Sequence, residues 1–121
     1  MMGGSLFMKI NGVEFNDLDF TDADLVEAFD KGCEQVGKKV NELIKNKDNL
    51  SPAEGIRQEC KIVKDFFDYV FGDGTSEKLF KGKDSLSLCL KAYEDIIEIK
   101  NKQYEEYYSR IDLYSPERLQ R

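Results

Sequence analysis

Hydrophobic residues recur at helical spacing over three long stretches of the chain. Over residues 22–47 they follow one another at intervals of three and four, which is the pattern of a helix with one apolar seam. The seam consists of Val26, Phe29, Cys33, Val36, Val40 and Leu43. Similar spacing recurs after residue 51 and from Asp84 or Ser85 to about Leu113. The pattern therefore predicts three long helices that pack through their apolar faces.

The middle helix carries the clearest start and stop signals. Ser51 is a typical N-cap, a proline follows it, and Glu54 completes a capping box. The glycines of residues 72–74 are expected to end this helix, and Thr75 to cap a short helix that ends near Phe80. Four of the eight phenylalanines lie in this part of the chain. We therefore expect it to supply most of the core.

A β-hairpin is predicted before the first helix. Asn11 and Gly12 lie between two short alternating runs, and Asn-Gly is the strongest local signal for a two-residue turn. Because an isolated hairpin is only marginally stable, we expect Ile10, Val13 and Phe15 to dock on a helix of the same domain. The alternative is that the open strand edge pairs with another protein.

These elements define the predicted fold. It is mainly α, a bundle of three long helices with a small N-terminal β-hairpin and a short helix between the second and third long helices. We expect a single domain over residues 1–121, with residues 1–7 as an extension, 8–20 as the hairpin, 22–113 as the bundle and 114–121 as a flexible tail.

The net charge of −6 is concentrated at the N-terminal end. Residues 1–30 contain one basic and seven acidic side chains, which accounts for the whole net charge. A nucleic acid requires a basic surface, so it is not an expected partner, whereas an acidic rim could steer a basic protein. The spacing of the aspartates does not fit a calcium loop. We interpret residues 21–24 instead as a capping box in which Thr21 caps the first helix.

The residue inventory argues against catalysis and cofactors. The chain has three cysteines and no histidine, and no cysteine pair has the C-x-x-C spacing of a zinc site. We interpret Cys33, Cys60 and Cys89 as small buried hydrophobes. No nucleophile motif or phosphate-binding loop is present, so we expect a protein that is not an enzyme and binds no metal or cofactor. The absence of an apolar run near 18 residues predicts a cytoplasmic protein without a membrane partner.

The last helix changes character along its length. Its apolar positions are mainly aliphatic up to Ile99, and tyrosines follow at Tyr104, Tyr107, Tyr108 and Tyr114. Tyrosine combines apolar area with a polar tip, so this end is either a contact surface or a helix end whose rings lie over the rim of the bundle. The sequence leaves these two interpretations equally open.

Three strings carry a family resemblance. They are MKINGVEF near the start, FFDYVFGDGTSEKLFKGK in the middle and YSPERLQR at the end. Together they resemble a family of small uncharacterised proteins from phages and prophages of low-GC Gram-positive bacteria. The resemblance spans residues 8–121 and is most specific over residues 66–83. It implies a place in the tail-morphogenesis gene group, where small helical proteins are commonly tail assembly chaperones.

The resemblance leads to a functional expectation. The protein is expected to be a non-catalytic binder of the tail-tube or tape-measure protein in the cytoplasm of the bacterial host. Its expected contact patch consists of Tyr104, Tyr107, Tyr108, Tyr114, Pro116, Arg118 and Arg121. The alternative is a homo-oligomeric structural or adaptor protein whose subunits pack through the seam from Val26 to Leu43.

Overall fold

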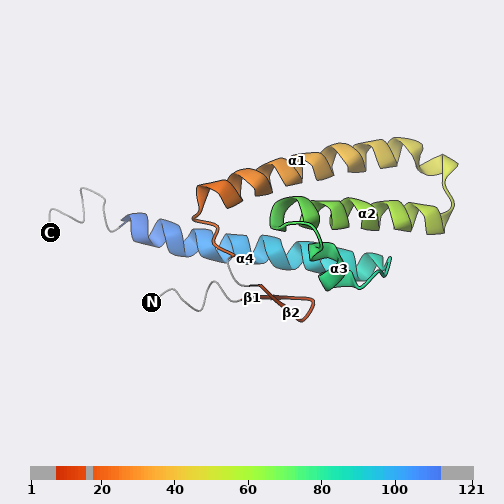
Figure 1. Ribbon diagram of the computed structural model, residues 1–121. Coiled ribbons are helices and arrows are strands. Elements are labelled where there is room, and N and C mark those ends of the chain that lie inside the picture. The colour runs from red at the N-terminus through yellow and green to blue at the C-terminus, as the bar shows by residue number, and fades with distance from the viewer. Residues whose placement is uncertain (1–7, 16–17, 113–121) are drawn as a thin grey trace, which may run out of the picture.

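The computed structural model describes residues 8–15 and 18–112. The elements, in order, are β1 (Met8–Ile10), β2 (Val13–Phe15), α1 (Ala23–Asn46), the 3-10 turn η2 (Lys47–Asn49), α2 (Pro52–Phe71), α3 (Thr75–Phe80) and α4 (Leu86–Asp112). Helices α1 and α2 form an antiparallel pair, and α4 runs along them (Figure 1). The predicted fold class is confirmed. The predicted extension 1–7 and tail 114–121 lie outside the described residues.

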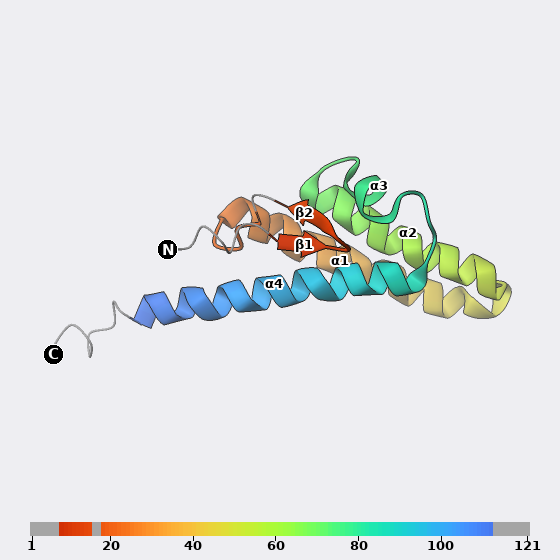
Figure 2. The ribbon, with the colours of Figure 1, turned by 90° about the horizontal axis from the view of Figure 1, so that it is seen from below.

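The β-hairpin docks on the helices of its own chain (Figure 2). Asn11 and Gly12 both have positive φ, at 50° and 79°, as a type I′ turn requires. The side-chain amide of Asn11 donates a hydrogen bond to the Leu88 carbonyl of α4 at 3.2 Å. Ile10 is fully buried, and the ring of Phe15 lies 5.8 Å from that of Phe71. Docking within the domain is therefore confirmed.

The helix starts follow from local capping. The hydroxyl of Ser51 accepts a hydrogen bond from the Glu54 N–H at 3.2 Å, which confirms the predicted start of α2. The prediction that Thr21 caps α1 is wrong by one residue. The cap is Asp22, whose carboxylate accepts the Leu25 N–H at 3.0 Å. Thr21 instead donates hydrogen bonds from its hydroxyl and its N–H to the carboxylate of Asp19, because that acceptor lies two residues before it.

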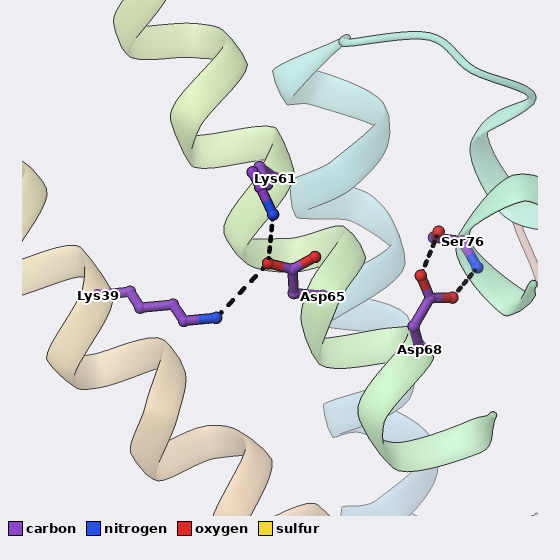
Figure 3. Close-up of polar contacts among 5 residues, drawn as sticks. All are labelled: Lys39, Lys61, Asp65, Asp68 and Ser76. Atoms are coloured by element: carbon purple, nitrogen blue, oxygen red, sulfur yellow. Dashed lines mark hydrogen bonds and ion pairs between the residues drawn. The ribbon is translucent and has the colours of Figure 1, made fainter. Parts of the chain in front are cut away.

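Helix α3 is capped by a residue of α2, as Figure 3 shows. The Asp68 carboxylate accepts hydrogen bonds from both the N–H and the hydroxyl of Ser76, each at 2.8 Å. The prediction that Thr75 is the cap is wrong, because Thr75 is the first residue of the helix and donates its hydroxyl to the Gly72 carbonyl at 2.7 Å. The N-cap position belongs to Gly74, whose φ of 92° favours glycine and which offers no side-chain acceptor. A distant carboxylate therefore takes over the capping role.

The core is a continuous set of aromatic contacts that joins every layer. Ring centroids lie 5.2 Å apart for Phe20 and Phe29, 5.5 Å for Phe29 and Phe66, and 5.0 Å for Phe66 and Tyr93. All three pairs are edge-to-face, the geometry that the ring quadrupoles favour. Phe67 of α2 is fully buried beside Phe66. Among the described residues, α2 and α3 together supply seven of the 15 buried hydrophobic side chains, which is the largest share but not most of the core as expected.

Helix α2 packs tightly against α1 at Gly32. A Cβ added there would lie 2.9 Å from Cγ2 of Val70 and 3.0 Å from the ring of Phe66. Gly37 has nothing within 4 Å of the same position. Only Gly32 is therefore required by a close approach between helices.

The predicted seam of α1 is covered unevenly. Phe29 is buried, and Cys33 and Val36 are partly buried against the core. The far end of the α1–α2 pair extends beyond the start of α4 in both ribbon views (Figures 1 and 2), and there Ile44 is 56 % exposed and Ile56 40 % exposed. The first half of the seam thus packs against other elements of the same chain.

The three cysteines lie in or beside the core, as predicted. Cys60 and Cys89 are fully buried, and burial raises the pKa of the Cys89 thiol to about 12. Cys33 is partly buried and accepts a hydrogen bond from the Tyr93 hydroxyl at 3.6 Å. All three thiols are free. Such thiols pack as hydrophobes and are poor nucleophiles.

Candidate functional site

A buried glutamine joins the start of α1 to the second half of α4. Gln103 is only 4 % exposed. Its Nε2 donates to the Leu18 carbonyl at 2.6 Å, and its Oε1 accepts the Phe20 N–H at 2.7 Å. Leu18 and Phe20 are themselves buried. The two hydrogen bonds therefore hold the segment that precedes α1 against a helix more than 80 residues away in the sequence.

Gln103 is not among the site residues predicted from the sequence, although a signal for it exists. Gln103 lies seven residues after Ile96 and four after Ile99, so it continues the buried face of α4. An uncharged amide at such a position must find partners, because a buried polar group without hydrogen bonds is costly. The sequence alone does not show which backbone groups it binds.

The juxtaposition forms an open groove between the start of α1 and the second half of α4, called here the α1–α4 groove. Its volume is about 510 Å³. It is lined by Phe20, Thr21, Ala23, Val26, Glu27, Asp30, Tyr104, Tyr107 and Tyr108. Helix α1 contributes the carboxylates, and α4 contributes the phenol rings. Figure 1 shows that the C-terminal end of α4 extends beyond the start of α1. Helix α1 therefore covers only part of the second half of α4.

The three tyrosines form one cluster of rings. The ring centroids of Tyr104 and Tyr108 lie 6.3 Å apart, and those of Tyr107 and Tyr108 lie 5.4 Å apart. Tyr108 is 63 % exposed and Tyr107 39 % exposed, whereas Tyr104 is partly buried against the core. The three rings therefore differ in their surroundings. Tyr104 lies over the rim of the bundle, and the other two rings face outward.

Negative charge and a cation both act on Tyr104. Burial raises the pKa of its hydroxyl, and the carboxylate of Asp30 raises that pKa further. The Lys100 ammonium lies 5.6 Å from the centroid of the Tyr104 ring and 5.2 Å from that of Phe29. This geometry is that of a cation–π contact. The aromatic end of the groove thus already attracts a positive side chain of the chain itself.

The carboxylates of α1 give the groove an acidic edge. Glu27 lies 3.6 Å from the Lys31 ammonium, but both side chains are well exposed, so this ion pair contributes little. Asp30 makes no ion pair within residues 8–15 and 18–112. The charged side chains that line the groove are therefore both acidic, while Lys31 and Lys100 lie beside it.

The structure brings together only part of the predicted contact patch. Tyr104, Tyr107 and Tyr108 lie together in the α1–α4 groove. The other predicted members, Tyr114, Pro116, Arg118 and Arg121, lie outside the described residues. Two carboxylates of the acidic stretch, Glu27 and Asp30, thus line the same groove as these three tyrosines, although the sequence places the two stretches at opposite ends of the chain.

The described residues contain no group of three or more cysteine, aspartate and glutamate side chains placed to hold a metal ion. Across residues 8–15 and 18–112, no helix combines the length and the apolar character needed to cross a membrane.

A protein-family model matches nearly the whole chain, over residues 11–121, and is described as a family of unknown function (DUF6673). No curated protein and no solved structure gives a significant match. The family match includes every residue that lines the α1–α4 groove.

Proposed function

The chain belongs to the DUF6673 family, whose function is unknown, and we propose that it is a non-catalytic protein-binding module that holds its partner in the α1–α4 groove. One observation carries this proposal. Exposed phenol rings of α4 and carboxylates of α1 line the same open groove. Tyrosine is enriched in the centres of protein interfaces, because it adds apolar area and a hydrogen-bonding tip with few rotatable bonds.

The groove also has the structural support that a binding surface needs. Phe20 forms part of its wall and is held by the Gln103 hydrogen bond, while Tyr104 packs against the core. Tyr107 and Tyr108 project from the same helix as Tyr104, so their backbone is ordered before a partner arrives. Such preorganisation reduces the entropy lost on binding.

The resemblance described above suggests which partner to test. We propose that the groove binds a tail-tube or tape-measure protein of a phage or prophage, in the cytoplasm of the bacterial host. In this role the protein shields an apolar segment of its partner until the tail assembles. The resemblance supports this context, and the groove supports only the binding.

A pull-down with matched tyrosine variants tests the proposal. The proteins encoded by the genes that flank this one, which under this proposal include the tail-tube and tape-measure proteins, are co-expressed with the wild type, with Tyr107→Ala/Tyr108→Ala and with Tyr69→Ala. Tyr69 lies on α2, is 47 % exposed and does not line the α1–α4 groove, so it controls for loss of a surface tyrosine. We expect the double variant to lose the partner and Tyr69→Ala to retain it. Full retention by the double variant refutes the binding site.

The homo-oligomer remains the second candidate because the far end of the α1–α2 pair exposes Ile44 and Ile56. Since Phe29 is buried within the chain, subunits could pair only through this far end and not through the whole seam from Val26 to Leu43. Sedimentation of the protein at tens of micromolar separates the two candidates. A monomer at this concentration would contradict the homo-oligomer.

A further inference from the structure

We propose that the α1–α4 groove selects a cationic partner segment, one in which arginine or lysine side chains alternate with apolar residues. This inference rests on the proposed function and adds the chemistry of the ligand. The groove offers such a segment three kinds of contact: the partly exposed apolar side chain of Val26, carboxylates at Glu27 and Asp30, and the exposed tyrosine rings.

The aromatic contacts favour a cation. Lys100 shows this within the chain, because its ammonium lies over both Phe29 and Tyr104. Tyr107 and Tyr108 are more exposed than Tyr104, and no cation–π contact to either ring occurs within residues 8–15 and 18–112. A guanidinium or ammonium from a partner can therefore occupy ring faces that the chain leaves open.

The charges favour the same ligand. The Asp30 carboxylate has no ion-pair partner among the described residues, and the first 30 residues account for the whole net charge of −6. A basic segment approaching this end is attracted before contact and neutralises the carboxylates after it. An acidic segment is repelled there.

A second groove, between the far end of α1 and the first half of α2, does not share this preference for a cation. This α1–α2 groove, of about 560 Å³, is lined by lysines as well as acids. Its Asp65 carboxylate is paired with Lys61 at 2.9 Å and with Lys39 at 3.5 Å, as Figure 3 shows. Two lysines thus lie among its three carboxylates, so its lining carries less negative charge than the α1–α4 groove, which is lined by two carboxylates and no basic side chain.

Nuclear magnetic resonance titration of the full chain tests the inference. The probes are a short peptide of leucine, alanine and arginine and its twin with every arginine replaced by glutamine. We expect the arginine peptide to shift the amide resonances of residues 26–30 and 104–108, and to bind more weakly as salt is added. We expect the glutamine twin to bind at least about tenfold more weakly, because two exposed ion pairs and cation–π contacts are lost.

Charge variants locate the effect. Glu27→Gln/Asp30→Asn should weaken binding of the arginine peptide about tenfold. The control Glu42→Gln/Asp48→Asn removes the same charge from exposed positions at the far end of α1 and in η2, and should leave the affinity unchanged. Spectra of the free variants establish that both are folded.

The possible results separate this inference from the proposed function. Equal binding of the two peptides at residues 26–30 and 104–108 overturns the cationic preference but leaves the groove as a binding site. Arginine-peptide shifts elsewhere, no binding, or equal loss in both charge variants also overturns the inference. If the peptide binds the groove only after Arg118→Gln/Arg121→Gln, the chain's own arginines compete for it and an external cationic partner is refuted. Failure of the proposed function is read separately, from partner retention by the tyrosine variant.

Discussion

Replacing Gln103 with methionine should destabilise the protein far more than its small change in volume suggests. Methionine is unbranched and of similar length, so it can fill the same space in the core. It cannot accept the Phe20 N–H or donate to the Leu18 carbonyl, both of which bind Gln103 at short distance. The substitution therefore leaves two buried backbone groups without these partners.

The magnitude follows from the cost of such groups. Each unsatisfied buried donor or acceptor costs about 1–3 kcal/mol, so Gln103→Met should lower the free energy of unfolding by about 2–6 kcal/mol. A protein of this size has a total of roughly 6–18 kcal/mol at about 0.05–0.15 kcal/mol per residue. The predicted loss is thus a large part of the whole.

Urea unfolding followed by circular dichroism measures the global loss, and amide hydrogen exchange measures the local one. We expect the Phe20 amide to exchange much faster in the variant, because its acceptor is gone. A loss below about 0.5 kcal/mol, together with wild-type exchange at Phe20, would refute the idea that Gln103 holds this segment.

A glutamate at position 103 gives an independent test through pH. A neutral carboxyl can both donate and accept, as the amide does, whereas the carboxylate can only accept. Burial and the Leu18 carbonyl both favour the neutral acid, so the folded-state pKa should lie above the unfolded value of about 4.3. The stabilising contribution is then fully present below that value and is lost as pH rises through the folded pKa. Measured against the wild type at each pH, Gln103→Glu should lose stability between acid and neutral pH, and a constant difference would contradict this reasoning.

Two further changes test the packing and the capping. Gly32→Ala places a Cβ 2.9 Å from Cγ2 of Val70 and should cost about 1–3 kcal/mol in unfolding free energy, whereas Gly37→Ala, with open space around it, should gain up to about 1 kcal/mol from helix propensity. Urea unfolding measures both, and equal effects at the two glycines would contradict the assigned close approach. Asp68→Ala removes both acceptors of Ser76 and should cost about 1–2 kcal/mol, with faster amide exchange in α3 than in α2. Unchanged exchange in α3 would show that Asp68 is not its cap.

Local signals in the sequence were sufficient for most of the secondary structure. The spacing of apolar residues, the Ser51 cap and the Asn11-Gly12 turn act between residues at most four apart, so their physical effect can be recognised without the fold. The cap of α1 is also local, but several neighbouring side chains can act as the acceptor. The predicted cap, Thr21, is therefore one residue before the observed cap, Asp22.

Contacts between distant elements could not be predicted in this way. Asp68 caps a helix that begins after a glycine turn, and Gln103 binds backbone groups more than 80 residues away. Both roles depend on how the chain reverses direction. Periodicity identifies the residues that face inward, but it does not show which inward faces meet.

Local patterns in the sequence predict three long helices, a hairpin, an acidic N-terminal stretch and a tyrosine-rich end of the last helix. Tertiary packing brings Glu27 and Asp30 of the first stretch and Tyr104, Tyr107 and Tyr108 of the second into one groove. The reason is physical. Each stretch follows from interactions within a few residues, whereas their meeting depends on the packing of α1, α2 and α4 and on the hydrogen bonds of Gln103.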